Sequence, residues 1–194
     1  MIPDKLLRSA SVFANRSNLL LHLASREPRW KHVAEIGVAF GGFSKTIIEI
    51  LNPDFFYAVD KFIIHQLDII FGSPPSLTLG DKEHLIWYQE QFPTASICPG
   101  LSWEVLATFA DASLDFAYLD AGHDFESVTK DIRELKRVVK RGGIIMFDDY
   151  TNFDTIAWEQ FGVLAAVNRY IEEGHQVLGI SLHPEGFHNI AVVN

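Results

Sequence analysis

The sequence predicts an α/β fold, namely a doubly wound, mostly parallel seven-stranded sheet with an antiparallel C-terminal hairpin. Three observations support this prediction. Short continuous apolar runs, typical of strands covered on both faces, alternate with amphipathic helical patterns. Several runs end at a carboxylate, and a glycine-rich turn follows the first of them. Only residues 183–186 join the last two runs, so these must pair antiparallel, because a parallel return needs a long crossover.

Length, charge and cysteine content limit the classes of protein to consider. The 194 residues, 48% of them hydrophobic, suffice for one full core, so we expect one domain over residues 1–194. The net charge of −9 argues against nucleic-acid and membrane partners and favours a small-molecule substrate, because phosphates require clustered Lys and Arg. Cys98 is the only cysteine, and no membrane-spanning or signal-type run is present, so we expect a cytoplasmic location. The chain leaves homo-oligomer formation open.

Residues 1–29 are expected to form an N-terminal helical segment. Apolar residues recur at helical spacing between Asp4 and Arg26, which predicts two short helices that end before Pro28. Packing on the domain edge is the simpler role for this segment. The alternative is that it covers the substrate mouth or a partner subunit.

Residues 33–44, VAEIGVAFGGFS, form the first candidate site. The apolar residues predict a buried strand, and the glycines predict a turn before a helix that runs to residue 51. Glycine allows a backbone to bend sharply and approach a ligand closely, while N–H groups at a helix start can face that ligand. The pattern predicts a nucleotide-type cradle, although its spacing differs from the dinucleotide fingerprint G-x-G-x-x-G. The candidate cradle residues are Glu35, Gly37, Gly41, Gly42 and Ser44.

The second strand, over residues 55–59, ends at Asp60. A carboxylate in this position is well placed to accept hydrogen bonds from a ribose diol. A helix cap or turn role is the alternative for Asp60. A third short strand is expected over residues 95–98.

Residues 61–93 interrupt the alternation of strands and helices. They contain a turn at residues 72–75 and a predicted helix over residues 81–91. Long segments above the carboxyl edge of a sheet often form lids and substrate pockets, so we expect a lid or substrate insertion here. His65, Trp87 and Tyr88 are candidates for substrate contact, with packing as the alternative for each.

The second candidate site lies between residues 114 and 150. A strand over residues 114–119 ends at Asp120, and a strand over residues 144–147 ends at Asp148 and Asp149, with a helix predicted between them over residues 125–140. Parallel neighbours would bring these carboxylates to one edge, where they would repel unless a cation or proton intervened. An oxygen-only ligand set suits Mg²⁺. The alternative is that Asp148 and Asp149 cap a loop.

The C-terminal part completes the predicted sheet. Residues 155–173 show a helical pattern, and residues 176–182 and 187–193 are the two strands of the hairpin.

The two candidate sites together resemble the class I S-adenosylmethionine-dependent methyltransferases, which have a Rossmann-like fold. The motifs are G-V-x-x-G-G-x-S, D-A-G-H and D-D-Y, and the resemblance covers residues 30–150. More narrowly, the chain resembles the metal-dependent macrocin and mycinamicin sugar O-methyltransferases. It is also similar to catechol O-methyltransferase, which has Asp-Asn in place of Asp148-Asp149.

The resemblance implies roles for individual residues. Ser102 and Trp103 would lie beside the adenine, with core packing as the alternative for Trp103. Asp120 would contact both the cofactor and the metal. Asp148 and Asp149 would be the other magnesium ligands. His123, three positions after Asp120, would be the catalytic base, a task that suits imidazole near neutral pH.

The expected function is therefore a magnesium-dependent O-methyltransferase that uses S-adenosylmethionine and methylates a hydroxyl of a small-molecule diol, either a sugar or another natural product. The first alternative is a nucleotide-dependent oxidoreductase of Rossmann type, for which the glycine spacing is wrong. The second is a cofactor-binding protein without catalysis, which would not need His123 or the paired aspartates.

Overall fold

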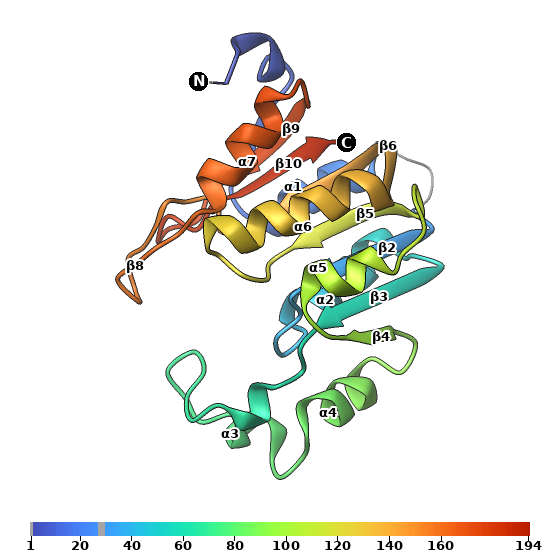
Figure 1. Cartoon of the computed structure of the whole chain (residues 1–194), viewed down its shortest axis with the longest axis vertical. Helices are drawn as coiled ribbons and strands as arrows, with labels where there is room; N and C mark the ends of the chain where they lie inside the picture. Colours follow the sequence, from blue (N-terminus) through green and yellow to red (C-terminus); the bar gives the residue numbers. More distant parts are fainter. Residues whose placement is uncertain (1, 27–29) are drawn as a thin grey trace.

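The computed structural model describes residues 2–26 and 30–194, so the predicted helix stop at Pro28 lies outside the described residues. An eight-stranded sheet forms its centre, in the order β1-β9-β10-β6-β5-β2-β3-β4 (Figure 1). Strand β10 pairs antiparallel with β6 and β9, and the other neighbouring strands in this sheet pair parallel. The strands are β1 (Ser11–Phe13), β2 (His32–Ile36), β3 (Phe55–Asp60), β4 (Ser96–Pro99), β5 (Leu114–Leu119), β6 (Val139–Phe147), β9 (Val177–Ser181) and β10 (Asn189–Val193).

Helices cover both faces of this sheet, which confirms the predicted α/β class and the antiparallel hairpin. Helices α5 (Ser102–Ala107), α6 (Phe125–Val138) and α7 (Val163–Glu172) pack on one face (Figure 1). Helices α1 (Arg16–Ala24) and α2 (Gly42–Leu51) pack on the other, and Tyr88 of α4 (His84–Gln91) extends that second core. None of the described helices has the length and apolarity needed to cross a membrane.

The prediction of seven strands was wrong, because β1 adds an eighth at the sheet edge. β1 pairs parallel with β9, placing Ser11 opposite Gly179. A Cβ on Gly179 would lie 2.8 Å from the Phe13 ring and 2.9 Å from Leu19, so this glycine lets β1 and α1 approach the sheet. The N-terminal segment is therefore not wholly helical. It consists of a 3₁₀ turn (Asp4–Leu6), β1 and α1.

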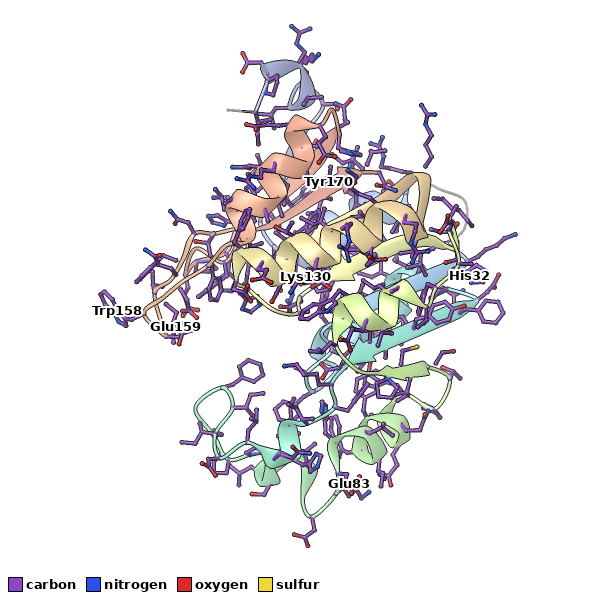
Figure 2. All side chains as sticks on the ribbon, viewed as in Figure 1. His32, Glu83, Lys130, Trp158, Glu159 and Tyr170 are labelled. Atoms are coloured by element: carbon purple, nitrogen blue, oxygen red, sulfur yellow. The ribbon has the colours of Figure 1, made fainter. Side chains whose placement is uncertain are left out.

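Two predicted helices were too long. Helix α6 ends at Val138, and β6 begins at the next residue. Helix α7 begins at Val163, and the preceding residues contain a short hairpin, β7 (Phe153–Asp154) with β8 (Glu159–Gln160). Gly162 lies between this hairpin and α7, where the backbone packs closely against the start of α6. A Cβ on Gly162 would lie 2.2 Å from the backbone nitrogen of Phe125, and the Gly162 N–H donates to the His123 carbonyl at 2.7 Å. Figure 2 shows Trp158 and Glu159 projecting at the tip of this hairpin.

Residues 61–93 extend beyond the carboxyl end of β3 as an irregular segment (Figure 1). It contains a 3₁₀ turn (Ile64–Gln66) and two helices, α3 (Ser76–Leu79) and α4. The predicted start of α4 at residue 81 was three residues early, because the helix begins at His84. The imidazole of His84 is buried, and its Nε2 lies 2.7 Å from the Ala39 carbonyl, which ties α4 to the glycine-rich turn.

Gly37 permits the closest backbone approach at the carboxyl edge of the sheet. Its φ is +87°, and a Cβ would lie only 1.7 Å from the Asp120 carbonyl oxygen. Gly142 has a nearly equal φ of +82°, but a Cβ there would have no neighbouring atom within 4 Å. The two glycines therefore separate the cost of backbone strain from the cost of a steric clash.

We expect Gly142→Ala to lower the free energy of unfolding by about 1–2 kcal/mol, the cost of left-handed backbone for an L-residue. Gly37→Ala should lose that amount and roughly 1–3 kcal/mol more, because the β2 and β5 ends must separate. Urea unfolding of both variants measures the difference. Equal transition midpoints would show that the sheet edge adapts to a side chain at Gly37.

Candidate active site

The carboxyl ends of β2, β3, β5 and β6 open into a cavity of about 1260 Å³. Several parts of the chain line it: residues 14–17, the glycine-rich turn, residues 59–71, the start of α5, the loops after β5 and β6, and the β9–β10 connection. The structure thus gathers ten of the site residues that the sequence suggested. They are Glu35, Gly37, Gly42, Asp60, Ser102, Trp103, Asp120, His123, Asp148 and Asp149.

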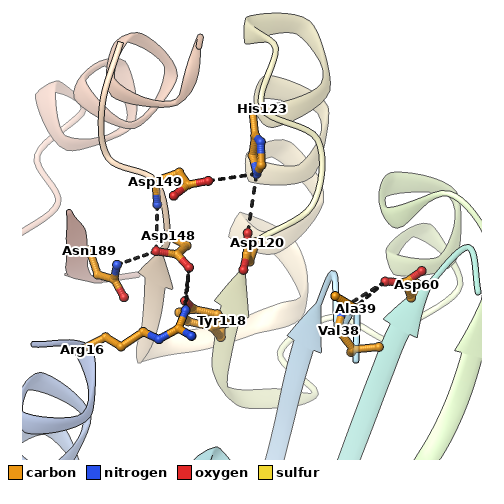
Figure 3. Close-up of polar contacts among 10 residues, drawn as sticks. All are labelled: Arg16, Val38, Ala39, Asp60, Tyr118, Asp120, His123, Asp148, Asp149 and Asn189. Carbon is orange, nitrogen blue, oxygen red and sulfur yellow. Dashed lines mark hydrogen bonds and ion pairs between the residues drawn. The ribbon is translucent and has the colours of Figure 1, made fainter. Parts of the chain in front are cut away.

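Asp60 holds the glycine-rich turn in place (Figure 3). Its Oδ2 accepts hydrogen bonds from the N–H groups of Val38 at 2.9 Å and Ala39 at 3.3 Å. Its Oδ1 accepts one from the N–H of Phe62 at 2.8 Å. The turn role that the sequence left open is therefore present. Contact with a ribose stays a prediction.

Gly41 and Ser44 lie beneath the turn and do not line the cavity. The Ser44 hydroxyl is buried, donates to Oε2 of Glu35 and accepts a hydrogen bond from the Tyr88 hydroxyl at 2.7 Å. A Cβ on Gly41 would lie 2.2 Å from the Phe92 ring. Ser44 and Gly41 thus contact α4 and the residue that follows it, so these two residues support the glycine-rich turn.

Burial raises the pKa of Glu35 well above its ordinary value, and the Ser44 hydroxyl only partly opposes this effect. The Glu35 carboxyl group is therefore buried, accepts a hydrogen bond from Ser44 and forms part of the cavity wall. Of the three candidate contacts in residues 61–93, Tyr88 is fully buried, and neither His65 nor Trp87 lines the cavity. The packing alternative fits Tyr88, which bonds Ser44.

An acidic cluster with one imidazole lies at the adjoining end of the cavity (Figure 3). His123 Nε2 lies 3.5 Å from Oδ1 of Asp120 and 3.3 Å from Oδ2 of Asp149. Asp120 follows β5, Asp149 follows β6, and His123 lies just before α6. One ligand atom from each residue lies within 4.8 Å of the other two.

Asp148 does not join this cluster. Its buried carboxylate accepts hydrogen bonds from Arg16 at 2.9 Å, from the Tyr118 hydroxyl at 2.5 Å and from the Asn189 amide (Figure 3). The resemblance implied that Asp148 is a third metal ligand, whereas the structure turns its carboxylate into a protein-internal network. Asp149, the next residue, has a left-handed backbone with a φ of +49°, and it lines the cavity.

The charges of the cluster affect one another. Burial alone lowers the pKa of His123, but the carboxylates of Asp120 and Asp149 outweigh it, so the pKa is raised. Burial, followed by repulsion from Asp120, raises the pKa of Asp149 to about 6. Burial and the neighbouring carboxylates of Asp120 and Asp149 also raise the pKa of Asp148, against the effects of Tyr118 and Arg16. The site therefore favours added positive charge.

The donor set fits a divalent cation. Asp120 and Asp149 offer carboxylate oxygens, and Nε2 of His123 is buried without a hydrogen-bond partner among the described residues. Hard cations such as Mg²⁺ prefer carboxylate oxygen, so Asp120 and Asp149 are the groups suited to hold the cation, and Nε2 of His123 keeps its lone pair for a proton. The arrangement can hold a cation, or in its absence a proton on His123, between the two carboxylates.

Helix α6 supports Ser102 and Trp103 at the other end of the cavity. The ammonium of Lys130 lies 4.9 Å from the centre of the Trp103 ring, a cation–π contact. Asp131 is fully buried, and burial raises its pKa to about 6, while the Ser102 hydroxyl opposes this rise. The sequence offered no signal for either contact, because both connect separate helices.

Arg16, Tyr118 and Asn189 are site residues that the sequence reasoning missed. Arg16 comes from α1, and its guanidinium also stacks over Phe43 at 4.2 Å from the ring centre. Its Nη1 lies 3.1 Å from the Tyr118 hydroxyl. Arg16 and Asn189 lie at opposite ends of the sequence, so local periodicity could not bring them together. The only available hint was their polarity beside predicted apolar elements.

The raised pKa of Asp149 predicts how stability depends on pH. The folded state holds the proton of the Asp149 carboxyl more tightly than the unfolded state does. The protonated carboxyl therefore contributes fully to the free energy of unfolding below pH 3.8, and this contribution is lost as the pH rises through about 6. Each pKa unit corresponds to about 1.4 kcal/mol, so ionisation of Asp149 lowers the free energy of unfolding by up to ~3 kcal/mol at neutral pH.

Asp149→Asn should therefore stabilise the metal-free protein at pH 7.5, by up to about 3 kcal/mol, and change little at about pH 3, where the carboxyl is protonated in both states. Urea unfolding at both pH values, beside the control Asp68→Asn at an exposed position, measures this. Destabilisation by Asp149→Asn at pH 7.5 would contradict the repulsive environment described for this carboxylate.

The fold is shared with solved methyltransferase structures. A candidate type 11 methyltransferase from Sulfolobus solfataricus is 15% identical, with a TM-score of 0.63 over 94% of this chain and 93% of that one. A candidate caffeoyl-CoA O-methyltransferase from Staphylococcus aureus is 12% identical, with a TM-score of 0.59 over 98% and 88%. The N-methyltransferase NodS from Bradyrhizobium japonicum, solved with S-adenosyl-L-homocysteine, is 12% identical, with a TM-score of 0.57 over 91% and 83%.

No curated protein matches the chain. The family model described as a methyltransferase domain matches residues 34–150, which is more than half of the sequence. This range begins in β2 and ends just after Asp149, so it includes the glycine-rich turn and the acidic cluster. The chain belongs to the methyltransferase domain family.

Proposed function

We propose that this protein is an S-adenosylmethionine-dependent O-methyltransferase that methylates a hydroxyl of a small-molecule diol. The observation that carries the proposal is the position of His123 Nε2, 3.3 Å from Asp149 and 3.5 Å from Asp120, in the same cavity as the glycine-rich turn. A base beside paired carboxylates suits removal of a proton from a hydroxyl. N-methylation of a neutral amine would not require the same arrangement.

The cavity lining supports S-adenosylmethionine as the methyl donor. Its first part runs from Gly37 and Asp60 to Ser102 and Trp103, which gives carboxylate, backbone and aromatic surfaces for a nucleoside. Carboxylates in the lining also suit a sulfonium cation. NodS, with the same fold, was solved with S-adenosyl-L-homocysteine. When bound, S-adenosylmethionine supplies an electrophilic methyl group.

Asp120 and Asp149 are the residues we propose to hold a divalent cation, Mg²⁺ in the first instance. Such a cation supplies Lewis acidity that lowers the pKa of an acceptor hydroxyl. The carboxylates of Asp120 and Asp149 raise the pKa of His123, and charge compensation at these groups moves His123 toward its neutral form. Neutral His123 can then accept a proton near physiological pH.

The transfer step follows from these positions. Nε2 of His123 takes the hydroxyl proton, and the oxygen forms a bond to the methyl carbon as the carbon–sulfur bond breaks. The electron pair of that bond remains on sulfur, which leaves as the neutral thioether. The walls around Asp120 and Asp149 orient the hydroxyl, and orientation of this kind supplies much of the acceleration in transfer reactions.

Membership of the methyltransferase domain family favours this proposal over a nucleotide-dependent oxidoreductase. A cofactor-binding protein without catalysis is the remaining alternative, and a variant of His123 distinguishes it. The macrocin and mycinamicin branch, the cytoplasmic location, homo-oligomer formation and the absence of nucleic-acid or membrane partners stay predictions.

We expect His123→Ala to lower kcat by roughly 10²–10⁴-fold, because the general base is lost. Affinity for S-adenosylmethionine should change little, because the glycine-rich turn and Asp60 remain. Release of S-adenosylhomocysteine with a panel of diols measures turnover, and calorimetry measures binding. His65→Ala, at an exposed position that does not line the cavity, is the control. Full activity of His123→Ala would eliminate the base assignment.

The two adjacent aspartates should respond differently to substitution. Asp149→Asn should weaken Mn²⁺ binding, used as a spectroscopic probe of a divalent site, by tenfold or more. Asp148→Asn should keep Mn²⁺ binding, because the carboxylate of Asp148 bonds Arg16, Tyr118 and Asn189 and does not join the cluster.

Electron paramagnetic resonance of free Mn²⁺ gives the affinity without an activity assay, and urea unfolding checks that both variants are folded. The opposite pattern, with binding lost only in Asp148→Asn, would restore the ligand set that the sequence resemblance implied.

A further inference from the structure

We propose that the methyl acceptor is an uncharged diol carried on an apolar body, either an aromatic ring or an aliphatic chain, and is neither a free sugar nor a coenzyme A ester. This inference rests on the proposed function and identifies the substrate class for the same site. Three features support it: the size of the cavity, the apolar wall beside the acidic cluster and the distribution of charge.

The cavity is larger than a single ligand needs. Its volume of about 1260 Å³ exceeds the roughly 300–1,000 Å³ typical of small-molecule sites. The first part, from Gly37 to Trp103, suits the nucleoside of the methyl donor. The remaining space is bounded by the acidic cluster, residues 14–17, residues 63–71 and the β9–β10 connection. This space is where a second molecule must lie to present a hydroxyl to His123.

The wall provided by residues 63–71 is apolar. The lining residues from this segment are Ile63, Ile64, Leu67, Ile70 and Phe71. Leu67 is 43% exposed and Phe71 is 78% exposed, so large apolar surfaces face the cavity without protein cover. Phe40, from the glycine-rich turn, lies 6.3 Å from Phe71 ring to ring and continues the surface toward the donor. Such a surface gains free energy when an apolar ligand covers it.

A second wall, from the β9–β10 connection and the adjoining strand ends, is partly apolar. Leu182, Pro184 and Phe187 line the cavity, and His183 stacks edge-on against Phe187 with ring centres 5.8 Å apart. The wall from residues 63–71 therefore offers no hydrogen-bonding side chain to an acceptor, and the second wall offers Ser181, His183 and Asn189, of which Asn189 already bonds Asp148. A sugar would lose the hydration of several hydroxyls here without replacement, which is costly. A diol with an apolar body needs polar partners only at its reacting end.

The charges lining the cavity argue against an anionic acceptor. Six carboxylates line it, against two Lys or Arg side chains among the described residues, Arg16 and Lys61. Arg16 is already paired with Asp148. The phosphates of a coenzyme A ester require clustered cations, so the lining differs from what such an acceptor needs. The likeness in fold to a candidate caffeoyl-CoA O-methyltransferase therefore does not extend to its acceptor.

A series of 4-alkylcatechols with methyl, propyl and pentyl chains tests the inference. Calorimetry with protein saturated with S-adenosylhomocysteine should show affinity rising about fourfold for each added methylene, as expected for burial of a CH₂ group. Methyl β-D-glucopyranoside should bind at least 100-fold more weakly than the pentyl compound. An affinity that does not change with chain length, or tighter binding of the glycoside, would overturn the inference.

A matched pair of variants locates the wall. Phe71 and Trp158 are 78% and 79% exposed, but only Phe71 lines the cavity. Phe71→Ser should reduce affinity for the pentyl compound at least fivefold and leave S-adenosylhomocysteine binding unchanged, whereas Trp158→Ser should change neither. Equal effects of the two substitutions would overturn the assignment of residues 63–71 as the acceptor wall. Failure of wild-type protein to bind S-adenosylhomocysteine would instead remove the proposed function, and the acceptor inference with it.

Discussion

Backbone hydrogen bonds that continue past the ends of the central strands determine the geometry of the site. The N–H of Gly37 donates to Val59, that of Asp120 donates to Ile36, and that of Asp148 donates to Leu119, at 2.7–2.9 Å. Each bond fixes the first residue after its strand relative to the neighbouring strand. The backbone positions of Gly37, Asp120 and Asp148 are therefore aligned along the carboxyl edge of the sheet. The closest approach along this line requires a glycine at position 37, because any Cβ would meet the Asp120 carbonyl.

This line of backbone bonds also explains why two adjacent aspartates have different environments. Asp148 is still in register with β5, so its carboxylate lies inside the protein, where Tyr118, Arg16 and Asn189 can reach it. Asp149 follows with left-handed backbone, and its carboxylate lies beside His123. One carboxylate thus holds the strand end in place, and its neighbour is available for chemistry. The substitution of either one tests a different property.

The sequence was sufficient to predict the architecture because the central strands are apolar on both faces and end at polar residues. From the strand ends it predicted that Asp120, Asp148 and Asp149 converge, and the resemblance added His123; the structure brings Asp120, Asp149 and His123 together, whereas Asp148 bonds Arg16, Tyr118 and Asn189. The sequence was insufficient for β1, whose three residues become a strand only through pairing with β9. It also could not show that Ser44 bonds Glu35 or that Arg16 reaches Asp148, because these contacts depend on tertiary packing between separate elements.

The ion pair between Arg16 and Asp148 links the N-terminal segment to the part of the chain that the family model matches. The family match begins at residue 34, so Arg16 lies outside it, yet its guanidinium contacts a residue near the end of that match. Residues 11–16, β9 and Asn189 form one unit with the end of β6, because each supplies a pairing partner to another. In related chains these positions should change together, and a chimaera that exchanges the N-terminal segment alone would separate a buried carboxylate from its counter-charge.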